Sequence, residues 1–408
     1  MSAVRDARPT TAARPVAAIP QALALALGAC VSLGLARFSY ALLLPPMRDD
    51  LGWSYFMAGA MNTVNAAGYL AGALLAPRLI ARRGARATLL GGMVGTALLL
   101  LAHGALRGEA ALLAARLASG VASAFVFMAG GLLAARLGGT PGAAGTSAGL
   151  VLGIYYGGTG LGIVASAWLV PPITAAARGW PWAWVALGVA ALACTAWTAR
   201  GVPPEHATSS AGGAAGPRAA FAWRRFVPSL AAYLLFGLGY IGYMTFVVTL
   251  LREEGLSGAL IVAFYTLLGL GVMASSWLWA GLLQRQRGGR ALALLNALLA
   301  LATVLPVLAG NVAAIFASGA LFGAVFLSVV ASTTALVRHN VEAAAWPAGI
   351  AAYTSVFALG QIAGPALVGA IADAAGGLRP GLGVSAAVLA AAALLAWLQK
   401  PSHPRDPP

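Results

Sequence analysis

Long apolar runs separated by short polar segments repeat along almost the whole chain. A helix that crosses a bilayer needs about 20 mostly apolar residues, and in lipid a helix satisfies its own backbone hydrogen bonds. Twelve runs reach this length, at residues 21–45, 53–80, 86–106, 109–136, 143–170, 181–200, 226–251, 258–283, 290–310, 311–337, 347–374 and 380–399. The pattern therefore predicts an all-α membrane protein with twelve transmembrane helices.

The composition supports the same class. The 408 residues are 60% hydrophobic and 9% charged, whereas an ordinary soluble domain is about 25% charged. A soluble enzyme and a nucleic-acid binder are therefore excluded, although the net charge is +15. The basic segment before residue 21 could also begin a secretory signal, but the apolar run continues to Leu44 and more spans follow. We expect it to precede the first membrane helix.

Basic residues are distributed unevenly between the two sides of the predicted bundle. Eighteen lie in segments on the side of the termini, and five lie on the other side. Basic loops favour the cytoplasmic side, so both termini are expected to be cytoplasmic. Lys400 is the single lysine among 25 basic residues, a bias typical of a GC-rich bacterial genome. We predict a multi-pass protein of the bacterial inner membrane, surrounded by the lipid bilayer.

Two sequence markers recur at an offset of 204 residues, which is half of the chain. Arg48-Asp49-Asp50 follows the first span and Arg252-Glu253-Glu254 follows the seventh, while Gly84 and Gly288 lie in matching basic loops. A repeat of this size indicates duplicated six-helix bundles. The predicted segments are an N-terminal tail at 1–20, bundles at 21–200 and 226–399, a cytoplasmic linker at 201–225 and a C-terminal tail at 400–408.

These features resemble the major facilitator superfamily over essentially the whole chain. The loop after the second span matches that family's basic loop motif imperfectly, because Ala81 stands where the family has Asp. The resemblance implies a gating role for Arg82, Gly84, Arg86, Gly288 and Arg290, and the alternative is a plain cytoplasmic anchor. The stretch Gly34-Leu35-Ala36-Arg37-Phe38-Ser39-Tyr40 is similar to the YbfB/YjiJ-type branch. The resemblance also suggests a monomer.

Small residues recur in the fifth and eleventh spans. Residues Gly153, Gly157, Gly160, Gly360, Gly364 and Pro365 resemble a glycine-rich motif often found in antiporters. Small residues four positions apart allow close helix contact, so we expect a helix-packing role for them.

Arg37 and Arg116 lie inside predicted spans, where an unpaired charge is costly and usually functional. No Asp or Glu lies deep in any predicted span. Guanidinium groups bind carboxylates well, so we predict an anionic substrate such as a small organic acid. The alternative is that these arginines bind backbone carbonyls or reach Asp49 or Glu109. Other expected binding residues are Tyr40, Asn62, Asn65, Tyr69, Tyr155, Tyr156, Tyr240, Tyr243, Tyr353 and Gln361.

The sequence indicates energy coupling only weakly. Asp49, Glu109 and Asp373 are the candidates for a titrating group, and all three lie near predicted outer ends. Proton symport, exchange with a counter-transported solute and simple facilitation all remain open.

The predicted function is a secondary transporter that works by alternating access. A multidrug or hydrophobic-compound exporter is the alternative, and a membrane sensor is a third reading. The sequence shows no nucleophile–base pair, metal-ligand cluster or phosphate loop, so we predict no enzyme activity, no metal and no cofactor.

Overall fold

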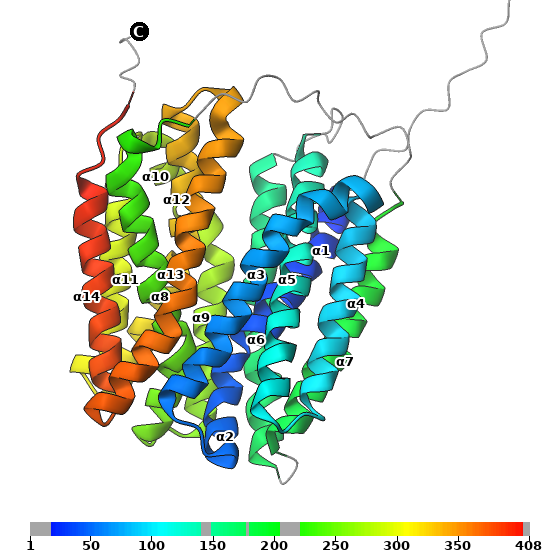
Figure 1. Cartoon of the computed structure of the whole chain (residues 1–408), viewed down its shortest axis with the longest axis vertical. Coiled ribbons are helices and arrows are strands. Elements are labelled where there is room, and N and C mark those ends of the chain that lie inside the picture. The colour runs from blue at the N-terminus through cyan, green and yellow to red at the C-terminus, as the bar shows by residue number, and fades with distance from the viewer. Residues whose placement is uncertain (1–17, 140–147, 177–178, 205–220, 403–408) are drawn as a thin grey trace, which may run out of the picture.

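The computed structural model describes residues 18–139, 148–176, 179–204 and 221–402. Within these ranges the regular elements are helices, and 12 of them are long and apolar enough to cross a membrane. They form two bundles that lie side by side (Figure 1). The predicted fold is confirmed. Most of the predicted linker and most of each predicted tail lie outside the described residues.

The N-terminal bundle contains six spans. The first consists of α1 (Ala18–Ala29), a π-helical segment η1 (Cys30–Phe38) and α2 (Tyr40–Leu51). The others are α3 (Tyr55–Arg83), α4 (Ala85–His103), α5 (Glu109–Gly138), α6 (Ala148–Ala175) and α7 (Gly179–Gly201).

The C-terminal bundle has the same order of spans. Its helices are η3 (Trp223–Phe226), α8 (Val227–Glu253), α9 (Gly258–Leu278), α10 (Ala280–Arg285), α11 (Arg290–Leu308), α12 (Val312–Asn340), η4 (Ala343–Ala345), α13 (Trp346–Ala375) and α14 (Leu378–Trp397). The short predicted break near Gly310 is present, and the Asn311 side chain caps α12 by accepting a hydrogen bond from Ala314 N at 2.9 Å.

An even number of spans places the beginning of α1 and the end of α14 at one end of the molecule, the top of Figure 1. We call this end the terminal face and the other the opposite face. Among the described residues, hydrogen bonds between the bundles join residues 37–63 to residues 245–265 and 361–373. In Figure 1, α3 and α13 converge toward the opposite face. The bundles are therefore joined most firmly on that side.

Glycines allow the closest contacts between helices. A Cβ atom on Gly160 of α6 would collide with the carbonyl oxygen of Gly269 on α9, so these helices touch backbone to backbone across the two bundles. Gly360 and Gly364 of α13 approach the α8 backbone in the same way. Gly153 and Gly157 have more room, since their nearest contacts are at 3.4 and 3.9 Å.

The carbonyl group of Pro365 also lies at a contact between the bundles, where it leaves no space for a side chain on Gly59 of α3. The α3–α13 and α6–α9 contacts therefore form the seam between the two bundles.

Candidate functional site

A wide helical turn positions Arg37. The segment Cys30–Phe38 is π-helical, and Ser39 N donates to Gly34 O at 3.0 Å, five residues earlier. Such segments are rare and are frequent at functional sites. Here the segment ends at the seam between the bundles, where Tyr265 of α9 donates its hydroxyl to Phe38 O at 2.6 Å.

Arg37 reaches across this seam. Its Nη2 donates to Gln361 Oε1 of α13 at 3.0 Å, and its guanidinium lies 5.5 Å from the centre of the Tyr69 ring. Gln361 in turn donates to the Tyr240 hydroxyl. We call Arg37, Tyr69, Tyr240 and Gln361 the Arg37 cluster. It joins α3, α8, α13 and η1, and so both bundles contribute to it.

The Arg37 charge has no counter-ion among the described residues. The side chain is only 4% exposed, its Nε has no hydrogen-bond acceptor there, and no described carboxylate forms an ion pair with it. A buried cation of this kind is costly unless another group neutralises it. The cluster therefore has unused capacity to bind an anion.

Aromatic rings surround the cluster on both sides. On the N-terminal side the ring centroids of Tyr69 and Phe127 are 6.5 Å apart, and those of Phe127 and Tyr156 are 5.8 Å apart. On the C-terminal side Tyr240 stacks on Phe236 at 4.8 Å and on Phe357 at 5.7 Å. A single cation between apolar rings suits a ligand that has one charged group and an apolar body.

Arg116 has a different environment. It is 1% exposed, and it donates to Ala36 O at 2.9 Å, to Met61 O at 3.4 Å and to Asn62 Oδ1 at 3.1 Å. Its guanidinium lies 4.7 Å from the centre of the Tyr40 ring. These contacts match the alternative in which an arginine binds backbone carbonyls, and they hold η1, α3 and α5 together.

The polar face of α3 divides between two roles. Asn65 Nδ2 donates to Arg116 O at 3.0 Å, and Asn62 Nδ2 donates to Thr245 Oγ1 at 2.7 Å across the seam. Both asparagines are therefore engaged with protein groups, whereas Tyr69 lies in the Arg37 cluster.

Four of the remaining tyrosines have protein partners and lie outside the Arg37 cluster. The Tyr40 hydroxyl donates to Ala58 O at 2.9 Å, and the Tyr155 hydroxyl donates to Phe127 O at 2.8 Å. The Tyr243 hydroxyl bonds to Ser318 Oγ at 2.6 Å, and the Tyr353 hydroxyl bonds to Ser229 Oγ at 2.5 Å. Tyr156 differs because its side chain is exposed and packs beside Phe127.

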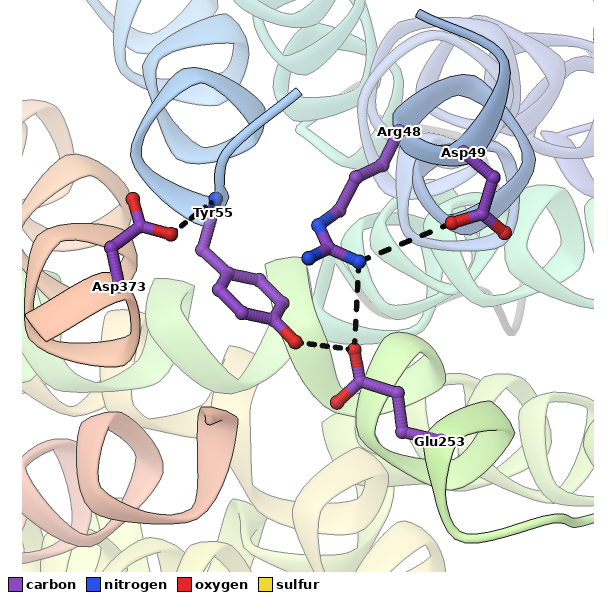
Figure 2. Close-up of polar contacts among 5 residues, drawn as sticks. All are labelled: Arg48, Asp49, Tyr55, Glu253 and Asp373. Carbon is purple, nitrogen blue, oxygen red and sulfur yellow. Dashed lines mark hydrogen bonds and ion pairs between the residues drawn. The ribbon is translucent and has the colours of Figure 1, made fainter. Parts of the chain in front are cut away.

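A second polar cluster joins the bundles at the opposite face. One carboxylate oxygen of Asp373, on α13, accepts from Tyr55 N at 2.8 Å (Figure 2), and the other accepts from Phe56 N at 2.8 Å. These are backbone donors in the first turn of α3, which have no partner within their own helix. Ser54 caps the same turn through Met57 N at 3.1 Å. The beginning of α3 is thus capped by a residue of the other bundle.

Glu253 of α8 makes a further contact between the bundles. Its Oε1 accepts from the Tyr55 hydroxyl at 2.6 Å and lies 3.8 Å from Arg48 Nη1 (Figure 2). Arg48 also lies over the Tyr55 ring, at 3.9 Å from its centre. We call Arg48, Tyr55, Glu253 and Asp373 the gate cluster. Separating the bundles at this face breaks the contacts that Asp373 and Glu253 make with the N-terminal bundle, whereas the Arg48–Tyr55 contact lies within that bundle.

The coupling candidates have different positions. Asp373 belongs to the gate cluster, whereas the Asp49 side chain is 76% exposed beside Arg48 and Glu109 is the exposed first residue of α5. Glu253 was not predicted as a functional residue. The repeat contained the signal that could have identified it, because Glu253 occupies the place in the second half that Asp49 occupies in the first.

The next acidic residue of each repeat binds within its own bundle. Asp50 accepts from Arg107 at 2.9 Å and from Trp180 Nε1 at 2.7 Å. Glu254 accepts from Arg379 at 2.8 Å. The two bundles are therefore braced in the same way at the opposite face.

The basic loops lie at the terminal face. Arg86 donates to Val202 O and Ala199 O, each at 2.8 Å, and so binds the end of α7 in its own bundle. The matching Arg290 lies 5.6 Å from the Trp397 ring centre at the end of α14. Gly84, with φ of 82°, makes the tight turn between α3 and α4, Arg82 is exposed at the end of α3, and Gly288 is half-buried beside Pro401. The gating role of these residues stays a prediction.

Comparisons with known proteins agree with this architecture. The model of a family described as "Uncharacterised MFS-type transporter YbfB" matches residues 29–397. No curated protein matches the chain.

Several solved transporters are similar in structure. A bacterial homologue of the human lysosomal transporter Spinster, inward-facing and unoccupied, has a TM-score of 0.69 at 16% identity, over 95% of this chain and 97% of that chain. The nucleoside transporter NupG has a TM-score of 0.69 at 12% identity, over 92% and 98%. The human organic anion transporter MFSD10 (TETRAN) has a TM-score of 0.64 at 16% identity, over 93% and 99%. At these identities the likeness shows the fold alone.

Proposed function

This chain belongs to the family of uncharacterised MFS-type transporters of the YbfB type, and we propose that it is a secondary active carrier that moves a small organic anion by alternating access. The observation that carries the proposal is the buried Arg37 charge at the seam between the bundles, which no described carboxylate neutralises. A site to which both bundles contribute is the place where a rocking motion exposes a substrate to either side.

The Arg37 cluster supports a carboxylate as the substrate group. A carboxylate accepts two parallel hydrogen bonds from one guanidinium, and it would neutralise the buried charge. The Gln361 amide, now bonded to Arg37 at 3.0 Å, can move aside because it is uncharged. The rings of Tyr69, Tyr240 and Phe236 would contact the apolar part of such a ligand. MFSD10, which shares this fold, is described as a human organic anion transporter.

The gate cluster supports a closed opposite face. An ionised carboxylate only accepts hydrogen bonds, whereas protonation turns one of its oxygens into a donor. A proton on Asp373 therefore removes one of its two acceptors, and a proton on Glu253 removes the negative charge beside Arg48. Protonation would then favour separation of the bundles at this face. This links the conformational cycle to protons, and it makes Asp373 and Glu253 the coupling residues we propose.

Arg37→Gln is expected to remove the anion site. Truncating one partner of a buried charged pair costs about 2–5 kcal/mol, which is roughly 30- to 5,000-fold in affinity. The measurement is the melting temperature of the purified protein against a panel of organic acids, sugars, amino acids and cationic dyes, because a ligand that prefers the folded state raises it. Wild type should be stabilised by carboxylates, and Arg37→Gln should not be.

Arg78→Gln is the matched control, since Arg78 is exposed on α3 and belongs to neither cluster. It should keep the carboxylate response. Stabilisation by cationic dyes that persists in Arg37→Gln, with no response to carboxylates in wild type, would contradict the anion proposal and favour an exporter of hydrophobic compounds.

Asp373→Ala is expected to loosen the beginning of α3. Loss of a helix cap costs about 1 kcal/mol, so the amides of Tyr55 and Phe56 should exchange with deuterium about fivefold faster. Hydrogen-exchange mass spectrometry of the peptide that contains them measures this. Asp49→Ala, which changes an exposed neighbour, should leave the rate as it is in wild type. Equal rates in all three proteins would remove Asp373 from the gate.

A further inference from the structure

A basic pocket lies at the terminal face of the C-terminal bundle and shares no residue with the Arg37 cluster. It has a volume of about 520 Å³, and its walls come from the loop between α10 and α11 and from the end of α14. The residues that give it its chemistry are Arg285, Arg287, Arg290, Trp397, Gln399 and Lys400.

Four cations line this pocket, and no carboxylate of the described residues balances them. Arg285, Arg287, Arg290 and Lys400 are all exposed, and none forms an ion pair with a described carboxylate. Glu342, which follows Asn340 by two residues, makes no ion pair with them either. Because like charges repel, four cations around one hollow create a positive potential that a multivalent anion would relieve.

The pocket is held in shape by backbone contacts. Gly289 N donates to Gln399 O at 2.9 Å, and a Cβ atom on Gly289 would collide with Ala396 O, so the loop lies directly on the end of α14. Asn340 Nδ2 donates to Arg287 O at 2.6 Å and fixes the loop from α12. Gln399 is 6% exposed. These contacts fix the backbone that carries the cations around the hollow.

The first turn of α11 adds backbone donors to the same place. Arg290 is the first residue of this 19-residue helix. The first N–H groups of a helix have no partner within it and carry a partial positive charge, which favours phosphate. Together with four cationic side chains, they form a set of donors suited to a phosphate group.

The neighbouring surface indicates where the phosphate comes from. Trp397 and Leu398 are 64% and 61% exposed, and Leu394, one turn earlier on α14, is 72% exposed. Tryptophan at the end of an apolar helix is typical of the membrane interface, and the exposed leucines offer a surface for acyl chains. The basic charge of this face also predicts that it meets the cytoplasmic leaflet, which is rich in anionic lipid.

We propose that this pocket binds the phosphate headgroup of an anionic phospholipid, with the acyl chains lying along α14 beside Trp397. The two repeats differ at this point. Arg86 of the N-terminal bundle uses its guanidinium to bind Val202 O and Ala199 O, whereas Arg290 makes no such contact with the end of α14 among the described residues and faces the pocket. The second loop has thus kept its cations available for a ligand.

Native mass spectrometry of the detergent-purified full chain tests this proposal, with phosphatidylglycerol and phosphatidylcholine as probes. Wild type should bind phosphatidylglycerol in preference. Arg287→Gln/Arg290→Gln should lower its affinity by about tenfold or more, since two cations near a lipid surface are lost. The matched control is Arg78→Gln/Arg83→Gln, which removes two exposed arginines of α3 from the same face and should leave the affinity unchanged.

Two results would overturn the proposal. An equal loss in the pocket and control variants would show that phosphatidylglycerol responds to general surface charge. Binding of inorganic phosphate or glycerol phosphate as tight as that of the lipid would show that a free phosphate is the ligand. If the double variant melts at a lower temperature than wild type without lipid, Arg285→Gln/Lys400→Gln replaces it, because these side chains line the same pocket from its two walls.

Discussion

Gly369→Leu is expected to reduce transport at least a hundredfold and to leave the carrier unable to close its opposite face. A Cβ atom on Gly369 of α13 would collide with the carbonyl group of Tyr55 at the beginning of α3. Backbone atoms cannot move aside as the end of a side chain can, so the leucine must push the two helices apart. Asp373 lies one helical turn further along α13. Its hydrogen bonds to Tyr55 N and Phe56 N, each at 2.8 Å, would then be lost.

Two measurements check this result. Uptake into proteoliposomes of the carboxylate that best stabilises the wild type should fall to background. Deuterium exchange in the first turn of α3 should rise by more than it does in Asp373→Ala. The leucine side chain separates the whole α3–α13 contact, whereas Asp373→Ala removes one helix cap. Gly383→Leu on α14 is the matched control, since nothing lies within 4 Å of the position of its Cβ atom. A Gly369→Leu carrier that transports at the wild-type rate would show that α3 and α13 need not touch for the cycle to proceed.

The fold was predictable because the bilayer imposes simple requirements on a sequence. Each span needs a long apolar run, and even the short break around Gly310 was visible as a polar interruption. The repeat was visible for a related reason. Asp50 and Glu254 bind arginines at equivalent corners of the two bundles, at 2.9 and 2.8 Å, so both copies have kept an acidic residue at the same offset.

The candidate site was only partly predictable, because its geometry depends on partners far away in the chain. Arg37 and Arg116 look alike in the sequence, as single cations in apolar runs. The partner of Arg37 is Gln361, 324 positions away. The partners of Arg116 include the carbonyl group of Ala36, 80 positions away. Pairings over such separations leave no local pattern in a single sequence.

The π-helical segment was also invisible in the sequence. Cys30–Phe38 contains no proline, and its residues would equally suit an ordinary transmembrane α-helix. In the structure this segment contacts other helices, and the Tyr265 hydroxyl donates a hydrogen bond to Phe38 O at 2.6 Å. Because Arg37 lies in this segment, the direction of its side chain could not be derived from a regular helical period.

Arg116→Gln is expected to destabilise the N-terminal bundle and to leave the anion site largely intact. Glutamine is too short to reach the three acceptors that Arg116 serves, at Ala36, Met61 and Asn62. Buried acceptors left without a donor cost about 1–3 kcal/mol each, so a loss of roughly 3 kcal/mol or more is expected. For a chain of 408 residues that is a fall of roughly 3–4 °C or more in melting temperature. Arg116→Lys should also destabilise, because an ammonium group lacks the planar fork that serves several acceptors together.

The comparison with Arg37 makes this prediction decisive for the roles of the two arginines. Arg37→Gln removes one hydrogen bond to the uncharged Gln361 and relieves an uncompensated charge, so its melting temperature without ligand should change little. Arg116→Gln should show the reverse, with a lower melting temperature and a smaller loss of carboxylate affinity than Arg37→Gln, because its acceptors are Ala36 O, Met61 O and Asn62 Oδ1 and none belongs to the Arg37 cluster. If Arg116→Gln melts at the wild-type temperature but no longer responds to carboxylates, Arg116 contacts the substrate. The anion site would then extend beyond the Arg37 cluster into the wall formed by η1, α3 and α5.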